Sequence, residues 1–364
     1  QLPSTTDEEA SASAYAKFLI IADNIKRTTR TGWQLRGLNN VETVASHMWS
    51  MAAEAAVRLP AWPGCSGANQ DRLVELCIVH DLAEAVVGDL TPHCGVPPDE
   101  KLRREQAALN SMAANLSRES SAKLISLFAE YNAQATVEAR LAKELDRLDM
   151  CCQAAYYQLT RPNCPNLSEF TRSCLSKTSI SGVSSRIRSA NVFVESAKSS
   201  ETDSAEIPFE QLTLFSRYKE MRLMPLQLPS TASWQPGPVP LGCHQYMVCL
   251  IALTLPKHCL PMLADTGAAE LVRTVGSANF YDDGSVAFSK LDLLDSDSLA
   301  CPFDSANSVA KDASASGQLL SDLVWLDVAL TARSAGASAA AAASGLPSRI
   351  SLSYLRQVCE HVLH

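Results

Sequence analysis

The residues with the clearest potential for chemistry are histidines and carboxylates on the apolar faces of expected helices. In the expected helix 71–87, His80 lies at helical spacing from a run of apolar residues and so should point inward. Asp81 follows it directly, and Glu84 lies one turn further along the same helix. Ionisable groups are costly to bury unless they are paired or bound to a metal, so this cluster requires a partner.

Two further expected helices carry ionisable residues in the same way. His47 shares an apolar face of helix 41–59, while Asp146 follows Leu145 in helix 137–159, with Asp149 one turn further on. Taken singly, such residues are more often hydrogen-bonded core histidines or solvent-facing acids. Taken together, two imidazoles and two carboxylates make a mixed nitrogen and oxygen site that suits Mn²⁺, Co²⁺, Fe²⁺ or Mg²⁺ better than a closed structural zinc site.

The elements that must position these residues are helices. Apolar residues at helical spacing predict an all-α fold up to about residue 178, with no convincing strand alternation. Asn39 and Glu42 offer a capping-box-like start for the second helix, and Gly88 suits the end of the third. The expected helices cover residues 14–26, 41–59, 71–87, 101–116, 122–131 and 137–159.

Beyond residue 178 the composition changes. Serine-rich stretches, the segment WQPGPVPLG and the run AGASAAAAASG are typical of linkers or low-complexity sequence. We expect a low-complexity, partly ordered C-terminal region with short helices, for example at 321–331 and 350–363. The predicted organisation is therefore a helical domain over residues 14–178 and an uncharacterised extension over residues 179–364.

Composition limits the classes of partner. The net charge of −8 and the isoelectric point of about 5.4 argue against a nucleic-acid polymer as partner, although a single nucleotide remains compatible. The twelve cysteines form no C-x-x-C pair, which excludes zinc-finger and thioredoxin-type motifs and indicates reduced thiols in a cytoplasmic protein. The longest apolar run, 246–255, is about half the ~20 residues needed to span a bilayer, so no membrane association is expected.

The order H…HD…D resembles the signature of the HD-domain phosphohydrolases. Over roughly residues 14–178 the chain is similar, more specifically, to the HD-domain 5′-deoxynucleotidases. This resemblance implies an HD-domain helical bundle that uses a divalent metal to hydrolyse deoxyribonucleoside 5′-monophosphates to nucleoside and phosphate, in a family where homodimers are common. The similar blocks are RTGWQLRG, VETVASHMW, VHDLAEAVVGDLTP, EKLRREQAAL and EYNAQATVEARLAKELDRLDM, with LSEFTRSCLSK as the last.

The resemblance also implies roles for individual residues. It makes His47, His80, Asp81 and Asp146 the metal ligands, and it favours Asp146 over Asp149 because Asp146 occupies the family's Leu-Asp position. Glu84 in the H-D-x-x-E block would activate or orient the attacking water. Asp89 in the G-D block would contact the substrate sugar or the leaving oxygen. Alternatively, a second cation would be held by Glu84, Asp89 and the carbonyl of Leu90.

The phosphate-binding and base-binding residues are less closely defined. Trp33 matches an aromatic residue that borders the nucleotide, although a core aromatic is an equal reading of the sequence. Some relatives carry arginine directly before this tryptophan, where this chain has Gly32. A guanidinium that orients the phosphate must then come from Arg30 or Arg36. Asp89 also fits a plain turn residue after a helix-ending glycine.

Two other functions remain open at the level of sequence. The same metal site would serve a deoxynucleoside triphosphate triphosphohydrolase or a cyclic-nucleotide phosphodiesterase. A different class of function is a scaffold whose C-terminal half binds a protein partner. The blocks around Trp33 and Asp89 favour the monophosphatase over the other two hydrolases, and the intact motif argues against the scaffold.

Overall fold

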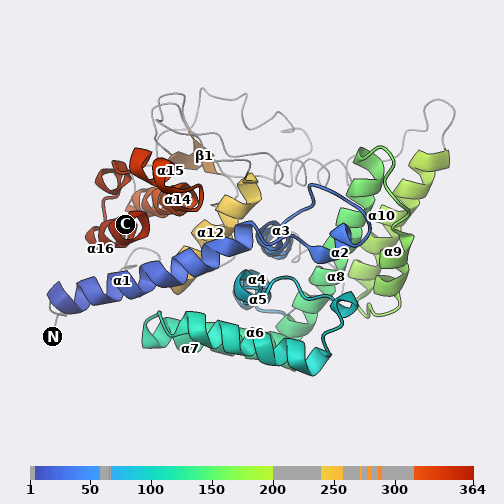
Figure 1. Ribbon diagram of the computed structural model, residues 1–364. Coiled ribbons are helices and arrows are strands. Elements are labelled where there is room, and N and C mark those ends of the chain that lie inside the picture. The colour runs from blue at the N-terminus through green and yellow to red at the C-terminus, as the bar shows by residue number, and fades with distance from the viewer. Residues whose placement is uncertain are drawn as a thin grey trace.

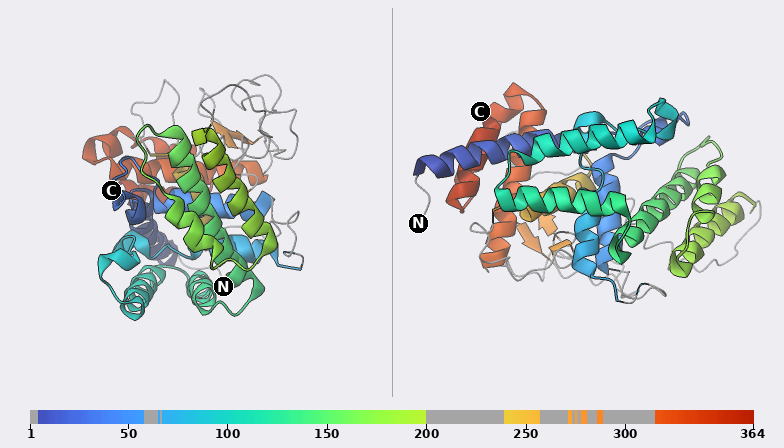
Figure 2. Two further views of the ribbon diagram at one scale, coloured as in Figure 1. Left: turned by 90° about the vertical axis from the view of Figure 1, so that its right-hand side faces the viewer. Right: turned by 90° about the horizontal axis from the view of Figure 1, so that it is seen from below.

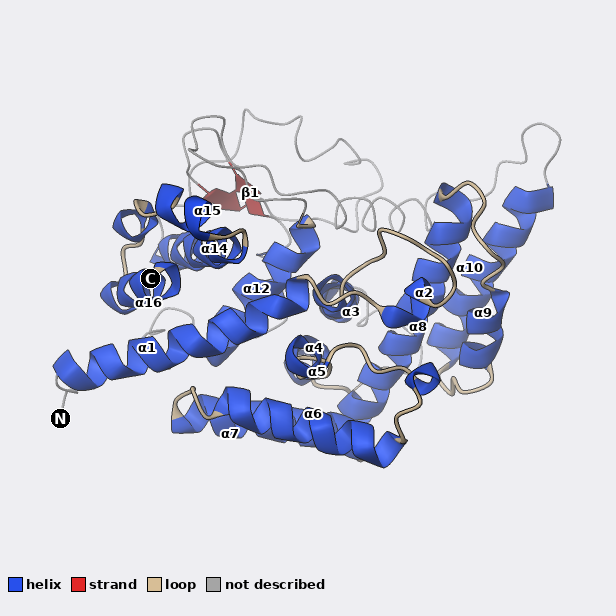
Figure 3. Ribbon diagram, in the orientation of Figure 1, coloured by secondary structure: helices blue, strands red, loops and turns tan. Residues whose placement is uncertain are grey.

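Helices dominate the chain. A computed structural model describes residues 5–57, 65, 67–199, 239–256, 271–272, 275, 278–280, 286–288 and 315–364. Within these ranges the single sheet is an antiparallel pair of short strands, β1 (Ala278–Phe280) and β2 (Val286–Phe288) (Figure 3). The predicted all-α fold is therefore confirmed, with this small pair of strands as an addition. None of the helices described combines the length and apolar character that crossing a bilayer requires.

The elements of the first half form a bundle of helices (Figure 1). These elements are α-helices, labelled α, and 3₁₀ segments, labelled η. In chain order they are α1 (Thr5–Ala22), η1 (Asp23–Lys26), α2 (Thr31–Gln34), α3 (Val44–Val57), α4 (Gln70–Val79), α5 (Glu84–Val87), η3 (Pro92–Cys94), α6 (Pro98–Ala113), α7 (Arg118–Ala133), α8 (Val137–Thr160), α9 (Ser168–Leu175) and α10 (Ser181–Ser199). The second half contributes α12 (Leu241–Thr254), α14 (Ala315–Ser334), α15 (Ala337–Ala342), η6 (Leu346–Arg349) and α16 (Ser353–Leu363).

Polar side chains determine where several helices begin. Asn69, Ser117 and Thr136 each accept a hydrogen bond from the backbone N–H three residues later, at the starts of α4, α7 and α8. Such caps satisfy backbone donors that have no partner inside the helix. Gly88 ends α5 with φ of 76°, a backbone conformation that glycine adopts without steric cost.

The expected start of the second helix is wrong. α3 begins at Val44, and the side chain of Thr43 accepts from the backbone N–H of Ser46 at 3.3 Å. Threonine therefore occupies the capping position that we expected Asn39 to hold. Glu42 does not complete a capping box. Its carboxylate is buried and accepts a hydrogen bond from Trp33.

The expected helix 71–87 is in fact two helices. α4 ends at Val79, α5 begins at Glu84, and a turn joins them. The backbone N–H of Leu82 bonds the carbonyl of Val79 at 3.0 Å, three residues back instead of four, so the helix tightens here and stops. His80 and Asp81 consequently lie at the end of a helix and not in its middle. Hydrophobic spacing did not reveal this break, because the apolar face continues through it.

Helices from the C-terminal half pack directly against those of the first half. α16 lies beside α1, and α12 runs between α14 and the central helices α3 and α4 (Figures 1 and 2). Tyr15 of α1 donates a hydrogen bond to the carbonyl of Ile251 in α12 at 3.0 Å. One continuous hydrophobic core contains residues of both halves. The expected short helices at 321–331 and 350–363 fall largely within α14 and α16, while the domain boundary at residue 178 stays a prediction.

A buried ionic network joins the two halves. The ammonium of Lys26, at the end of η1, has no solvent exposure and lies 2.7 Å from Asp23 and 2.6 Å from Asp327 of α14. Lys26 also donates to Thr331 at 2.9 Å. The second oxygen of Asp327 accepts a hydrogen bond from Nδ1 of His244 in α12. The two carboxylates balance the charge of the buried lysine. Removing either partner would therefore leave a buried charge less well compensated, which is costly.

Replacing Asp23 by asparagine should destabilise the protein at neutral pH. Burial alone would raise the pKa of Asp23, but Lys26, together with Ser334 and Arg27, outweighs this effect and lowers the pKa from 3.8 to about 2. A depressed folded-state pKa contributes stability above pH 3.8 that is lost as the pH falls toward 2. We expect the Asp23→Asn variant to lose about 2 kcal/mol of unfolding free energy at pH 7.

Urea unfolding at several pH values would measure this effect. The difference between the variant and the unmodified chain should shrink as the pH falls below about 4. Asp99→Asn, at an exposed position in the first turn of α6, is the matched control and should change stability little. A loss for Asp23→Asn that stayed constant down to pH 2, which is about the folded-state pKa, would contradict an ionised Asp23.

Candidate metal centre

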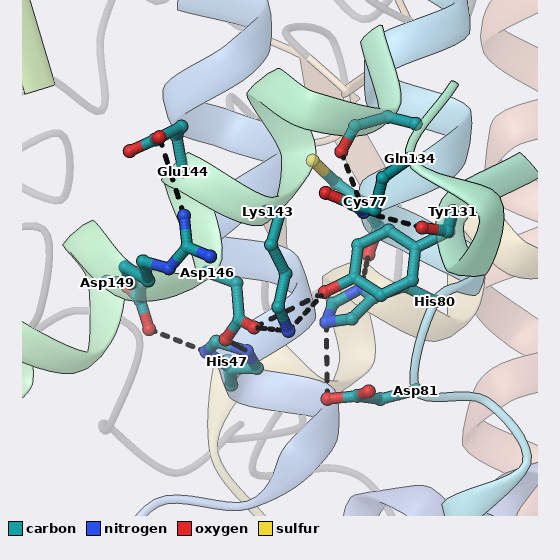
Figure 4. A network of polar contacts seen from close by, with 12 residues as sticks. His47, Cys77, His80, Asp81, Tyr131, Gln134, Lys143, Glu144, Asp146 and Asp149 are labelled. Atoms are coloured by element: carbon teal, nitrogen blue, oxygen red, sulfur yellow. Dashed lines mark hydrogen bonds and ion pairs between the residues drawn. The ribbon is translucent and has the colours of Figure 1, made fainter. Parts of the chain in front are cut away.

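Two helices and one turn bring the four expected ligands to one place. His47 comes from α3, His80 and Asp81 from the turn after α4, and Asp146 from α8. One ligand atom from each of His47, His80 and Asp146 lies within 4.8 Å of the others. Asp81 joins them through its carboxylate, 3.2 Å from Nε2 of His80. Figure 4 shows these side chains pointing toward one another.

His47 lies between two carboxylates of α8. Its Nδ1 is 2.8 Å from Asp149, and its Nε2 is 3.3 Å from Asp146 (Figure 4). A carboxylate on Nδ1 orients the ring and keeps the lone pair of the other nitrogen directed at the site. Asp149 therefore supports His47 from behind, while Asp146 faces the centre. The two carboxylates divide these tasks because they stand one helical turn apart.

The second imidazole is oriented by backbone. Nδ1 of His80 donates to the carbonyl of Cys77 at 3.0 Å, because a carbonyl can only accept. Nε2 of His80 faces the carboxylate of Asp81 at 3.2 Å. His80 and His47 thus each present Nε2 to the same space, with the ring centroids 5.6 Å apart.

The donor set fits a divalent cation. Nε2 of His47 and Nε2 of His80 are both buried and have no hydrogen-bond partner among the residues described. Unpartnered buried imidazole nitrogens are costly, and a metal ion satisfies them. Carboxylate oxygens of Asp81 and Asp146 complete a mixed nitrogen and oxygen set of the kind that Mn²⁺, Fe²⁺, Co²⁺ and Mg²⁺ accept.

Positive side chains surround the carboxylates. Burial would raise the pKa of Asp81 and of Asp146, but neighbouring charges hold both well below the ordinary range. For Asp81 the opposing charges are His80 and Arg30, and for Asp146 the largest is Lys143 at 2.7 Å. The two acids are therefore ionised, which is the form that binds a metal.

Glu84 is the next acid of the site. It begins α5 and is buried, and its Oε2 has no hydrogen-bond partner among the residues described. Burial and the charges of Asp81 and Asp89 raise its pKa well above the usual value. The ammonium of Lys101 lies 3.4 Å from Glu84 and donates to the carbonyl of Leu90 at 2.8 Å. A second cation on Glu84, Asp89 and Leu90 would have to displace this ammonium.

Asp89 lies in the loop after Gly88 and accepts a hydrogen bond from the backbone N–H of Thr31 at 2.6 Å. It thereby ties the 88–90 loop to the segment that carries Arg30. Negative charge from Asp89 is also the largest influence that raises the pKa of Arg30 against the opposing effect of burial. Asp89 therefore has a structural contact in addition to its expected role toward substrate.

The structure separates the two candidate arginines. Arg30 lies 3.3 Å from Asp81 and 3.7 Å from Asp146, so its guanidinium stands inside the site. Arg36 pairs instead with Glu169 of α9 and lies over the ring of Phe170. The guanidinium at the centre is thus the one from Arg30.

Trp33 lies in a small core behind the site. Its side chain is 2% exposed, contacts the rings of Tyr157 and Phe170, and donates Nε1–H to Glu42 at 2.9 Å. This packing matches the core-aromatic reading of Trp33. Glu42, in turn, offers an oxygen within 4.8 Å of ligand atoms of His47 and Asp149.

Sequence reasoning missed several residues that shape the centre. Lys143 donates to Asp146 and to the hydroxyl of Tyr131, which itself donates to Asp146 at 3.3 Å (Figure 4). The i, i+3 spacing of Lys143 and Asp146 was the available signal for the first of these contacts. Tyr131 comes from α7 and Glu42 from the loop before α3, and no local pattern connects either of them to the site.

Part of the chain is similar to known proteins. The family model of the HD domain matches residues 22–181. The chain is 35% identical over 177 residues to the 5′-deoxynucleotidase HDDC2 of Bos taurus, an alignment covering 49% of this chain and 84% of the relative. It is 37% identical over 151 residues to the protein of the same name from Homo sapiens, covering 40% and 70%.

A fungal relative gives the same result. The 5′-deoxynucleotidase hdd1 of Schizosaccharomyces pombe is 33% identical over 167 residues, covering 44% of this chain and 81% of the relative. These alignments take in most of each relative but less than half of this chain, so they concern the HD helices and not the whole C-terminal half. On this similarity over 70–84% of the relatives' length, the chain belongs to the HD-domain 5′-deoxynucleotidase family.

Proposed function

We propose that this chain is a metal-dependent 5′-deoxynucleotidase, which hydrolyses deoxyribonucleoside 5′-monophosphates to nucleoside and phosphate. The observation that carries the proposal is the pair of buried Nε2 atoms, from His47 and His80, that converge with two ionised carboxylates. Relatives that align over 70–84% of their length are named 5′-deoxynucleotidases. The proposed metal ligands are His47, His80, Asp81 and Asp146.

The proposed roles follow from the positions of the side chains. A divalent cation bound by these ligands would supply a Lewis acid for a phosphate oxygen and a water of lowered pKa. Glu84, buried beside Asp81 and with an unpartnered oxygen, would take the proton of the attacking water. Arg30 would turn from the two carboxylates to the phosphate, and Asp89 would contact the sugar or the leaving oxygen. Trp33 would support this wall of the site from the core behind it.

Several finer expectations belong to the same proposal. The metal is Mn²⁺, Co²⁺, Mg²⁺ or Fe²⁺, since the donor set suits all four and availability decides among them. A homodimer, a cytoplasmic location and the absence of a nucleic-acid polymer as partner also remain expectations. The overall charge of −8 supports the last of these.

A panel of nucleotides tests the proposed reaction. Deoxyribonucleoside 5′-monophosphates, the corresponding ribonucleotides, a deoxynucleoside triphosphate and a cyclic nucleotide are each incubated with the protein and each metal. We expect release of inorganic phosphate from the deoxyribonucleoside monophosphates and loss of release with a chelator. Release of triphosphate, or ring opening of the cyclic nucleotide as the main reaction, would establish one of the two alternative hydrolases instead. No turnover of any compound would favour the scaffold.

Paired substitutions should separate the two arginines. Arg30→Ala is expected to lower kcat/KM for the monophosphate about 10²-fold, because a guanidinium that orients the phosphate is lost. Arg36→Ala removes only a partly exposed ion pair with Glu169 and should change kcat/KM less than about threefold. Metal affinity should not fall in Arg30→Ala, because Asp81 and Asp146 lose a competing cation. Equal effects of the two substitutions on kcat/KM would contradict this assignment.

A further inference from the structure

α12 reaches both helices that deliver the histidines of the metal centre. The thiol of Cys243 lies 3.0 Å from the hydroxyl of Thr43, the residue that caps the start of α3. The hydroxyl of Tyr246 donates to the carbonyl of Ile78 near the end of α4 at 2.9 Å. Both contacts are buried. α12 therefore touches the start of the helix of His47 and the end of the helix that leads to His80.

The contact with Ile78 falls at the break between α4 and α5. In a continuous α-helix the carbonyl of Ile78 would accept from the backbone N–H of Leu82, four residues later. Here that N–H bonds the carbonyl of Val79, and the hydroxyl of Tyr246 takes its place on Ile78. The carbonyl before it, on Cys77, accepts from Nδ1 of His80.

Three successive carbonyls at the end of α4 are thus satisfied by three different donors. A helix end buried without such partners is unfavourable, because a buried carbonyl left unpaired loses its hydration without compensation. A donor from α12 stabilises the broken form over a helix that continues through the turn. The broken form is the one in which His80 and Asp81 point at the metal centre.

α12 is itself held in place by the ionic network. Nδ1 of His244 bonds Asp327, whose other oxygen lies 2.6 Å from Lys26. Lys26 stands four residues before Arg30, so the same network also supports the segment that carries the guanidinium of the site. Elements from beyond residue 239 therefore support the segments that bear His47, His80 and Arg30.

We propose that Tyr246 is a positioning residue of the metal centre, and that α12 belongs to the catalytic unit and not to a separable appendage. By donating to the carbonyl of Ile78, Tyr246 keeps α4 from continuing through the turn, and the orientation of His80 and Asp81 depends on this contact. The inference rests on the proposed metal centre. It assigns a task to a segment that the alignments with the HD-domain relatives do not explain.

Tyr246→Phe in the full-length protein tests the proposal, because it removes one hydroxyl and preserves the packing of the ring. Co²⁺ serves as the probe, since its visible absorption spectrum reports ligand geometry without turnover. We expect Co²⁺ affinity, measured by calorimetry, to fall about tenfold and the visible bands to shift. Phosphate release is measured separately.

Tyr15→Phe is the matched control. Tyr15 of α1 is also buried, and its hydroxyl donates to the carbonyl of Ile251 in the same helix α12, so it tests whether loss of any hydrogen bond to α12 has the effect expected of Tyr246→Phe. We expect this variant to lose thermal stability while retaining the Co²⁺ affinity and spectrum of the unmodified protein. 4-Aminophenylalanine at position 246 restores an N–H donor at the same place and should restore both readouts.

The outcomes are distinct. Unchanged Co²⁺ affinity and spectrum in Tyr246→Phe would overturn the proposal. An equal change in Tyr15→Phe would overturn the role of the contact between Tyr246 and Ile78, since the effect would then be general loosening of α12. If Tyr246→Phe does not fold, the 4-aminophenylalanine protein decides: folding with altered Co²⁺ bands opposes the proposal, and folding with normal bands supports it. Failure of the unmodified protein to bind Co²⁺ would instead show that the proposed metal centre is wrong, and the role of Tyr246 with it.

Discussion

Asp146→Ala is expected to abolish tight binding of the divalent cation and to lower kcat/KM at least ~10³-fold. Asp146 supplies the carboxylate that faces both Nε2 of His47 and the guanidinium of Arg30. Removing it takes away one negative ligand and leaves Lys143 with less compensation, so the centre loses attraction for a cation. Calorimetric titration with Mn²⁺ and an assay of phosphate release from a deoxyribonucleoside monophosphate measure the two effects.

The control for this substitution is Asp99→Ala. Asp99 is an exposed acid in the first turn of α6, outside the metal centre, and its loss should leave both measurements within about twofold. A folded Asp146→Ala protein that turns over substrate at the unmodified rate without bound metal would rule out the ligand assignment. Metal binding that survived with activity lost would place Asp146 among the substrate-binding residues instead.

Glu84→Gln should separate metal binding from chemistry. Glutamine keeps the shape of the side chain and a carbonyl oxygen that can accept from Lys101, so we expect Mn²⁺ affinity to change little. It cannot take a proton from water, and loss of a general base typically costs about 10²- to 10⁴-fold. The expected result is therefore a fall in kcat of this size with KM nearly unchanged.

Glu105→Gln is a closely matched control. Glu105 is also largely buried and lies 3.1 Å from the same lysine, but it stands on α6 outside the H-D-x-x-E block. Its substitution should change kcat less than about threefold. If Glu84→Gln lost metal together with activity, Glu84 would be a ligand, and the second-cation alternative would gain support. If both glutamine variants retained full activity, the base would have to be sought elsewhere.

Arg30 and Lys101 place positive charge next to the expected cation ligands of the centre. Each ammonium or guanidinium stands beside oxygens that were expected to meet a cation or a phosphate. Arg30 bridges the two acids that a metal would bind, and Lys101 bonds the Leu90 carbonyl. Binding of a metal by Asp81 and Asp146 would therefore move Arg30, whereas only a second cation on the Leu90 carbonyl would move Lys101.

The sequence by itself predicted the helical class and a set of candidate metal ligands. Both depend on local spacing, because an apolar stripe of period 3.6 that includes a histidine must bury it. His47 and His80 could be named as inward histidines for that reason. The resemblance to the HD-domain family selected them together with Asp81 and Asp146, and the neighbouring blocks led to the family that the comparisons then established. Where local spacing was silent, the expectations were wrong. The helix 71–87 is broken at residues 80–83, and the start of α3 is capped by Thr43.

Only the tertiary structure decided what lies around the ligands. Asp149 behind His47, Arg30 in place of Arg36, and Lys101 on the Leu90 carbonyl are contacts between separate elements, and no period in the sequence specifies them. The same holds for the C-terminal helices. The sequence showed which of their residues are apolar. It did not show that Tyr246 would contact the end of α4, 168 residues earlier in the chain. Spacing along a helix determines which face is buried, whereas packing in three dimensions determines what that face meets.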